Sequence, residues 1–310
     1  MLQGKDLLSI HDLSIEEVEE ILQLAKELKA MQLAGIEHHI LEGKTLGMIF
    51  EKASTRTRVS FEVGMYQLGG QALFLSNRDL QIGRGEPIRD TARVLSRYLD
   101  GIMIRTFGHD KLVEFAKWAD VPVINALTDL LHPCQALTDM LTIQEHLGSD
   151  LRGMKFAFIG DGNNMAHSLM YACSKLGIDF ALATPKGYEP DKTVVKNAKQ
   201  DAKESGATIT LTDDIWKAAK DADVLCTDVW TSMGEEEERE QRMKAFAGYQ
   251  INYDLLATAN KRAIVLHCLP AHRGEEITEE VFELNADVIF DEAENRLHTQ
   301  KAIMALLMGK

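Results

Sequence analysis

The sequence predicts an α/β fold made of two doubly wound, parallel-sheet domains joined by helices. The chain has 310 residues, which suits two domains of about 150 residues that each bury a core. Short apolar runs typical of strands alternate with helix-like amphipathic segments along the chain. Strands that alternate with helices form mostly parallel sheets that helices cover on both faces.

The first expected element is an amphipathic helix that begins at Ser14. Ser14 is a good N-cap, and Glu17 stands three residues later, as in a capping box. Strand-like runs follow, and helical patterns separate most of them. The expected strands are Thr45–Phe50, Ala72–Leu75, Gly101–Thr106, Val121–Ala126, Lys155–Gly160, Phe180–Thr184, Ala207–Leu211, Asp223–Asp228, Ala263–Leu269 and Asp287–Phe290.

We place the boundary between the domains at the helix-like segment Pro133–Leu147, which Gly148, Ser149 and Asp150 follow. The first domain then covers residues 1–132 and the second covers residues 133–291. We expect the last helical segment, residues 292–310, to return to the first domain because its Arg296 suits an anion site. Two facing α/β domains bind a ligand in the crevice beyond the carboxyl ends of their strands, where we expect the active site.

The composition narrows the function classes. The net charge is −14, which argues against a nucleic-acid partner or an anionic membrane surface. The four cysteines, Cys134, Cys173, Cys226 and Cys268, show no paired spacing, so reduced thiols and a cytoplasmic location are expected. The N-terminus resembles neither a secretory signal nor a transit peptide, and no apolar run has the length of a membrane span.

The segment Phe50–Arg58 is the most informative part of the chain. It joins a strand-like run to a helix-like one, so Ser54, Thr55, Arg56 and Thr57 stand at a helix N-terminus together with Arg58. Free backbone N–H groups and the helix dipole favour an anion there, and arginine adds bidentate recognition of oxygen atoms. The alternative is an N-cap serine before a solvated basic turn. Basic residues are unfavourable in a first turn unless an anion is bound, which favours a phosphate site.

Two further groups of candidate site residues follow predicted parallel strands. Arg105 follows the apolar run Gly101–Ile104, although an arginine at a strand end is also common on a plain surface. His132 and Gln135 flank the start of the helix that Pro133 begins, where donors aimed at a carbonyl oxygen stabilise developing negative charge. A lone histidine before a helix is more often a capping or packing residue.

The turn Gly160–Asn164 suggests a nicotinamide site, but two features weaken that interpretation. Met165 replaces the third glycine of the dinucleotide fingerprint. The next strand-like run ends at Thr184 without the acidic residue that would bind an adenine ribose. Asn163 and Asn164 suit a small polar substrate better.

Two strand ends in the second half carry the remaining candidates. Asp228 is expected to bind an ammonium group, with Ser232 nearby and Gly234 as a hinge, while the acidic run that follows suits a solvated helix start. Cys268 follows a buried strand, where a cysteine is usually a small core residue. His267, Cys268 and His272 suggest zinc, but no second ligand pair has metal-site spacing, so we expect neither a metal nor another cofactor.

Together these motifs resemble those of the aspartate/ornithine carbamoyltransferase family. The Ser54–Arg58 segment is similar to its carbamoyl-phosphate signature, and His132-Pro133-Cys134-Gln135 is similar to the second carbamoyl-phosphate element of its ornithine branch. Asp228 with Ser232-Met233-Gly234, and His267-Cys268-Leu269-Pro270, resemble the elements that separate ornithine enzymes from aspartate enzymes. The motifs occur in the family's order along the whole chain.

The resemblance implies substrates and residue roles. The expected substrates are carbamoyl phosphate and L-ornithine, and the expected assembly is a homotrimer whose active sites are shared between subunits. Arg105, His132, Asp228 and Cys268 would carry the catalysis, and Asn164, Asp228, Ser232 and Met233 would bind ornithine. Carbamoyl phosphate would be bound by Ser54, Thr55, Arg56, Thr57, Gln81, Arg105, His132, Pro133, Cys134, Gln135, Cys268, Leu269 and Arg296, with Gln81 reaching a neighbouring subunit.

Three alternatives remain open at this point. The first is a related carbamoyltransferase that acts on aspartate, putrescine or an acylated ornithine. The second is a nicotinamide-dependent oxidoreductase that uses the Gly160–Asn164 turn. The third is a binding protein without catalytic activity.

Overall fold

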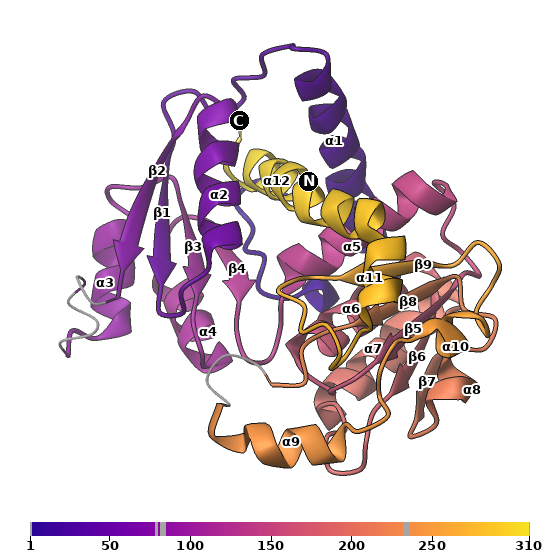
Figure 1. The fold of residues 1–310 in the computed structure, drawn as a ribbon. Helices are drawn as coiled ribbons and strands as arrows, with labels where there is room; N and C mark the ends of the chain where they lie inside the picture. The colour runs from indigo at the N-terminus through magenta and orange to yellow at the C-terminus, as the bar shows by residue number, and fades with distance from the viewer. Residues whose placement is uncertain (1, 78–79, 81–84, 232–235, 310) are drawn as a thin grey trace. The chain divides into compact units, whose positions relative to one another are not determined.

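The computed structural model describes residues 2–77, 80, 85–231 and 236–309. The chain divides into two compact units, Met1–Leu141 with Glu294–Lys310, and Thr142–Ala293. The division falls within two helices, α5 (Pro133–Leu147) and α12 (Ala286–Met308), so each of them supplies residues to both units (Figure 1).

The first unit is built on a four-stranded parallel sheet in the order β2-β1-β3-β4. Its strands are β1 (Thr45–Phe50), β2 (Gln71–Ser76), β3 (Gly101–Arg105) and β4 (Val123–Leu127). Its own helices are η1 (Ile10–Asp12), α1 (Ile15–Leu33), α2 (Thr55–Gln67), α3 (Ile88–Leu95) and α4 (His109–Trp118). The strand order reverses between β1 and β3, and ligands bind at such a switch point in open α/β sheets.

Helices cover both faces of this sheet. Leu112 and Phe115 of α4 and Ala92 of α3 pack with Ile102 and Ile104 of β3 in one apolar cluster. Helix α2 lies on the near face of the sheet in Figure 1 and packs closely on α12. A Cβ atom at Gly64 of α2 would stand 2.9 Å from the methyl carbon of Met304, so glycine permits this close approach.

The second unit is built on a five-stranded parallel sheet in the order β7-β6-β5-β8-β9. Its strands are β5 (Lys155–Ile159), β6 (Asp179–Ala183), β7 (Ile209–Thr212), β8 (Val224–Thr227) and β9 (Ile264–His267). Its own helices are α6 (Asn164–Leu176), α7 (Lys192–Ser205), α8 (Ile215–Ala219), η3 (Glu236–Glu238), α9 (Arg239–Ala245), α10 (Tyr253–Leu256) and α11 (Glu279–Leu284). Here the switch point lies between β5 and β8.

Most predicted elements are confirmed, with boundaries that differ by a residue or two. Helix α1 begins after Ser14, and the capping box with Glu17 is formed in both directions. Nine of the expected strands correspond to β1 to β9. Among the described residues, no helix combines the length and the apolar character needed to span a membrane.

The predicted strand Asp287–Phe290 is wrong, because these residues form the first turn of α12. A short apolar run cannot be assigned by periodicity alone. The buried positions continue as Ile289, Glu292 and Arg296, which is helical spacing, whereas Phe290 is exposed. The burial pattern beyond the run therefore decides in favour of a helix.

A buried lysine joins three segments of the first unit. The Nζ atom of Lys301 on α12 lies 2.9 Å from Gln32 Oε1 of α1, 2.9 Å from His38 Nε2 and 3.0 Å from Gln67 Oε1 of α2. Lys301 is fully buried, and burial lowers its pKa to about 8.

This lowered pKa predicts that stability rises with pH. Below about pH 8 both folded and unfolded chains hold the proton, so the cost of burying the charge is fully present. Between about 8 and 10.5 the unfolded chain holds the proton longer, so the cost disappears. Relative to Lys301→Met, the wild-type free energy of unfolding should rise by about 3 kcal/mol across this range.

Urea unfolding of both proteins at pH 7.5 and pH 10.5 measures this difference. Because other groups titrate alike in the two proteins, their contributions cancel. An unchanged difference between the two pH values would contradict the assignment of a buried, uncompensated charge at Lys301.

Candidate active site

The N-terminus of α2 forms the first half of the candidate site. Ser54 is the N-cap of α2, and its hydroxyl accepts a hydrogen bond from the Thr57 N–H at 3.2 Å. Ser54 therefore caps α2, which is compatible with a phosphate site as well as with a solvated basic turn. The first turn, Thr55 to Arg58, contains no acidic residue, so no side-chain carboxylate of this turn competes for the backbone donors at the helix start.

Arg296 on α12 connects this helix start to α5. Its Nη2 donates to Thr57 Oγ1 at 2.9 Å, and its Nη1 donates to Gln135 Oε1 at 2.6 Å. Nη1 also lies 3.5 Å from His132 Nε2. Arg296 is buried, so the first unit brings Thr57, His132, Gln135 and Arg296 into one network.

A high positive charge density surrounds His132. Burial, reinforced by the charges of Arg296 and Arg105, lowers the pKa of His132 well below its usual range. The imidazole is therefore neutral at pH 7. Arg105 is also buried, at the carboxyl end of β3. Two guanidinium groups beside a neutral imidazole favour an anion, even in a chain whose net charge is −14.

The neighbouring residues Pro133 and Cys134 have structural tasks. Pro133 is the first residue of α5, as its position in the sequence predicts. The Cys134 thiol is buried and donates to the Asn125 carbonyl at 3.4 Å. Burial raises the pKa of Cys134 to about 12, so this sulfur stays protonated. Cys134 therefore packs α5 against β4.

The two arginines after Ser54 differ in their surroundings. Arg58 donates to Glu62 Oε1 at 3.0 Å, and its guanidinium carbon lies 3.9 Å from the centre of the Phe74 ring. Arg58 is thus engaged by Glu62 and Phe74, and the recognition of oxygen atoms expected of it stays a prediction. Thr55 is exposed and Arg56 is half-buried in the first turn of α2. Gln81 lies outside the described residues.

The second unit brings Asp228 and Cys268 together at its switch point. The Asp228 carboxylate accepts hydrogen bonds from Val229 N at 2.8 Å, Asn163 Nδ2 at 3.0 Å and Cys268 Sγ at 3.3 Å. Asn164 is the first residue of α6, and Asn163 is its N-cap. The sequence pattern pointed to both asparagines as suited to a small polar substrate. The resemblance selected Asn164 alone, whereas Asn163 makes the contact with Asp228. Ser232 and Met233 lie outside the described residues.

Packing explains one glycine of the Gly160–Asn164 turn. A Cβ atom at Gly162 would stand 2.4 Å from Pro190 N and 2.6 Å from the carbonyl carbon of Glu189. Gly162 is thus required by the approach of another backbone segment, which weakens the nicotinamide interpretation. Asp161 pairs with the buried Arg242 of α9 at 2.7 Å, a contact that the sequence analysis missed.

A buried histidine and a buried glutamate support the turn that carries Cys268 and Leu269. His267 Nδ1 accepts from Leu269 N at 3.0 Å, so the proton of this ring lies on Nε2, which donates to Glu276 Oε1 at 2.9 Å. Leu269 adopts a left-handed backbone with φ of 58°. This contact holds the turn, and nothing in the sequence pattern singled out Glu276.

Comparisons with known proteins match both units. Residues 5–145 match the family model for the aspartate/ornithine carbamoyltransferase, carbamoyl-P binding domain. Residues 152–307 match the model for the Asp/Orn binding domain of the same family. Arg105 and His132 lie in the first match, and Asp228 and Cys268 lie in the second.

Close relatives cover nearly the whole chain. The ornithine carbamoyltransferase of Anoxybacillus flavithermus is 60% identical over 307 residues, which is 99% of this chain and 98% of the relative. The structure of the Pyrococcus furiosus ornithine carbamoyltransferase superposes with a TM-score of 0.95 at 55% identity and covers 99% of this chain and 98% of that one. The anabolic enzyme of Campylobacter jejuni gives a TM-score of 0.91 at 47% identity, with 97% of each chain covered. The chain therefore belongs to the aspartate/ornithine carbamoyltransferase family.

Proposed function

We propose that the protein transfers the carbamoyl group of carbamoyl phosphate to the side-chain amine of L-ornithine, giving L-citrulline and phosphate. The observation that carries this proposal is the buried network of Arg296, Thr57, Gln135 and His132 at the N-terminus of α2. It combines an anion-binding helix end with donors suited to a carbonyl oxygen.

Most of the carbamoyl-phosphate contacts are assigned to residues of the first unit. Ser54, Thr55, Arg56 and Thr57 hold the phosphate at the α2 N-terminus, and Arg105 bridges the phosphate and the carbonyl oxygen. His132 and Gln135 orient the carbamoyl group, supported by the charge of Arg296. Gln81, Pro133, Cys134, Cys268 and Leu269 complete the assigned set. Cys134 contributes through the position of α5, because its thiol faces Asn125.

Ornithine is assigned to the second unit. Asn164, Asp228, Ser232 and Met233 bind the amino-acid part of ornithine, and Asp228, beside Cys268, receives an ammonium group. Asn163 orients the Asp228 carboxylate through its amide. The names of the relatives support ornithine as the acceptor, and Asp228 supplies the anion that a diamine requires.

The reaction requires a neutral amine. The side-chain amine of ornithine resembles that of lysine, with a pKa near 10, so it must lose a proton before it attacks. Asp228 and Cys268 provide a place for that proton near the strand ends. The nitrogen then bonds to the carbamoyl carbon, and Arg105 and His132 stabilise the oxyanion. The bond from this carbon to the phosphate oxygen breaks, the attacking nitrogen gives its extra proton to the departing phosphate, and phosphate leaves. The activated carbonyl needs no cofactor.

A homotrimer with shared active sites is the proposed assembly. Exposed apolar side chains on the first unit support self-association, because large apolar groups at a surface often mark contacts with another chain. They lie on α2 and β2, namely Val59, Val63, Tyr66, Leu73 and Phe74. Light scattering would give three times the chain mass of 34.6 kDa for a trimer. A monomer mass would contradict this assembly.

The physiological setting is proposed from the relatives and the cysteines. Two relatives are named anabolic, which supports a role in arginine biosynthesis. All four cysteines are free thiols, which supports a cytoplasmic location. Initial rates with ornithine, putrescine and aspartate as acceptors discriminate the related transferases, and a titration with NADH tests the oxidoreductase alternative.

Arg56→Ala tests the phosphate site. Loss of a charge-assisted pair costs about 2–3 kcal/mol, so the affinity for carbamoyl phosphate should fall about a hundredfold. Arg58→Ala is the matched control, because Arg58 is engaged by Glu62 and Phe74. Calorimetric titration of both variants with carbamoyl phosphate measures the effect. Equal losses in the two variants would refute the assignment of Arg56.

Asp228→Asn tests the acceptor site. The isosteric amide keeps the size of the side chain but removes the charge that binds the ammonium group, so the KM for ornithine should rise at least about tenfold. The affinity for carbamoyl phosphate should stay within about twofold, because its main contacts lie in the first unit. Steady-state kinetics with each substrate varied in turn measure both values. Unaltered ornithine kinetics would count against Asp228.

A further inference from the structure

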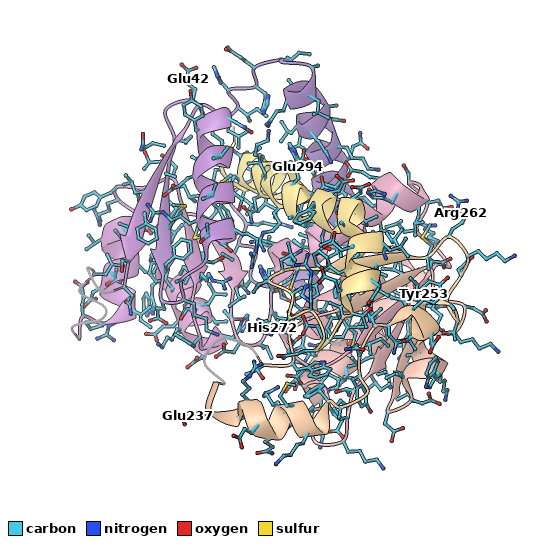
Figure 2. The ribbon with its side chains drawn as sticks, in the orientation of Figure 1. Glu42, Glu237, Tyr253, Arg262, His272 and Glu294 are labelled. Carbon is cyan, nitrogen blue, oxygen red and sulfur yellow. The ribbon has the colours of Figure 1, made fainter. Side chains whose placement is uncertain are left out.

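Three side-chain atoms without a hydrogen-bond partner belong to residues that are close in sequence in the second unit. They are His272 Nδ1, Glu275 Oε2 and Glu276 Oε2, and all three atoms are buried. Their residues follow β9, and Figure 2 marks His272 in this segment. His272 Nδ1 lies 3.7 Å from Glu275 Oε2. Each of the three residues offers a ligand atom within 4.8 Å of those of the other two.

Glu276 is the most constrained of the three. Its residue is fully buried. Its Oε1 already accepts from His267 Nε2 at 2.9 Å and from His272 N at 2.6 Å. Oε2 therefore remains as a buried acceptor, and burial of a polar group without a partner costs free energy.

The local charge also requires compensation. Glu275 and Glu276 bring two carboxylates together, and Arg239 pairs with Glu275 through Oε1, the other oxygen of that carboxylate. Among the described residues, Arg239 is the arginine that pairs with Glu275, and no arginine or lysine forms an ion pair with Glu276. A dication placed among the three atoms would neutralise the excess negative charge and fill all three acceptor positions.

We propose that His272 Nδ1, Glu275 Oε2 and Glu276 Oε2 bind a divalent cation of the manganese or zinc class. One imidazole nitrogen and two carboxylate oxygens, without a thiolate, suit these ions. Two ligands about 2.1 Å from a tetrahedral ion lie about 3.4 Å apart, close to the 3.7 Å between His272 and Glu275.

This set differs from the residues that suggested zinc in the sequence. His267 uses both ring nitrogens, for Leu269 and for Glu276, and the Cys268 thiol donates to Asp228. Neither is placed in the cation site. The two ligands besides His272 are Glu275 and Glu276, which the spacing of histidine and cysteine residues did not reveal.

The site has a structural task. Glu276 Oε1 contacts His267 and His272, one on each side of the turn formed by Cys268, Leu269, Pro270 and Ala271. A cation on Oε2 of the same carboxylate would fix Glu276 and with it both ends of the turn. We therefore assign the ion to stabilisation of the turn, separate from the substrates.

Titration of the full-length, chelator-treated protein with MnCl2 tests the proposal. Calorimetry should show a single saturable site per chain. Glu275→Gln and His272→Ala should each weaken Mn²⁺ binding at least about tenfold, because each removes a ligand. His39→Ala is the matched control: His39 and Glu37 form an exposed pair of the same residue types at 4.0 Å. This control should bind Mn²⁺ like the wild type.

Thermal unfolding gives a second measurement that does not depend on activity. Mn²⁺ should raise the Tm of the wild type and of His39→Ala, and at the same Mn²⁺ concentration it should raise the Tm of Glu275→Gln by clearly less. The Tm of each protein without metal verifies that the variants fold. Absence of saturable binding to the wild type would overturn the proposal, as would equal binding to Glu275→Gln.

Discussion

The arrangement of the first unit depends on the Arg296 guanidinium. It contacts Thr57 on α2 and Gln135 and His132 at the start of α5, so three helices that are distant in sequence converge on one buried cation. In these contacts the acceptors are neutral side chains. They hold the guanidinium beside the N-terminus of α2, where a positive charge and the helix dipole both attract an anion.

The second unit applies the same principle with the opposite charge. Asp228 is held by donors from a backbone amide, an asparagine and a cysteine, so its carboxylate is oriented without a cationic partner in these contacts. Each unit thus prepares a site of one sign at the switch point of its sheet. A cationic amine and an anionic acyl phosphate are the substrates that such a pair of sites suits.

Local patterns predicted most of the fold, because caps and apolar runs act within a few residues. The Ser14 capping box and the strand before Ser54 are examples. Asp287–Phe290 failed because its apolar run was shorter than the helix that contains it. The contact of Asp161 with Arg242 and the support from Glu276 could not be predicted, since both join segments whose pairing depends on the folded chain. The site motifs were found because their residues cluster in sequence.

The most direct test of this account is a crystal structure of the protein with a non-hydrolysable carbamoyl phosphate analogue, in which a methylene group replaces the bridging oxygen. The account predicts the phosphonate at the N-terminus of α2, within hydrogen-bonding distance of the backbone amides that follow Ser54, with its carbonyl oxygen directed at Arg105 and His132. An analogue bound elsewhere, with the α2 N-terminus occupied only by solvent, would contradict it.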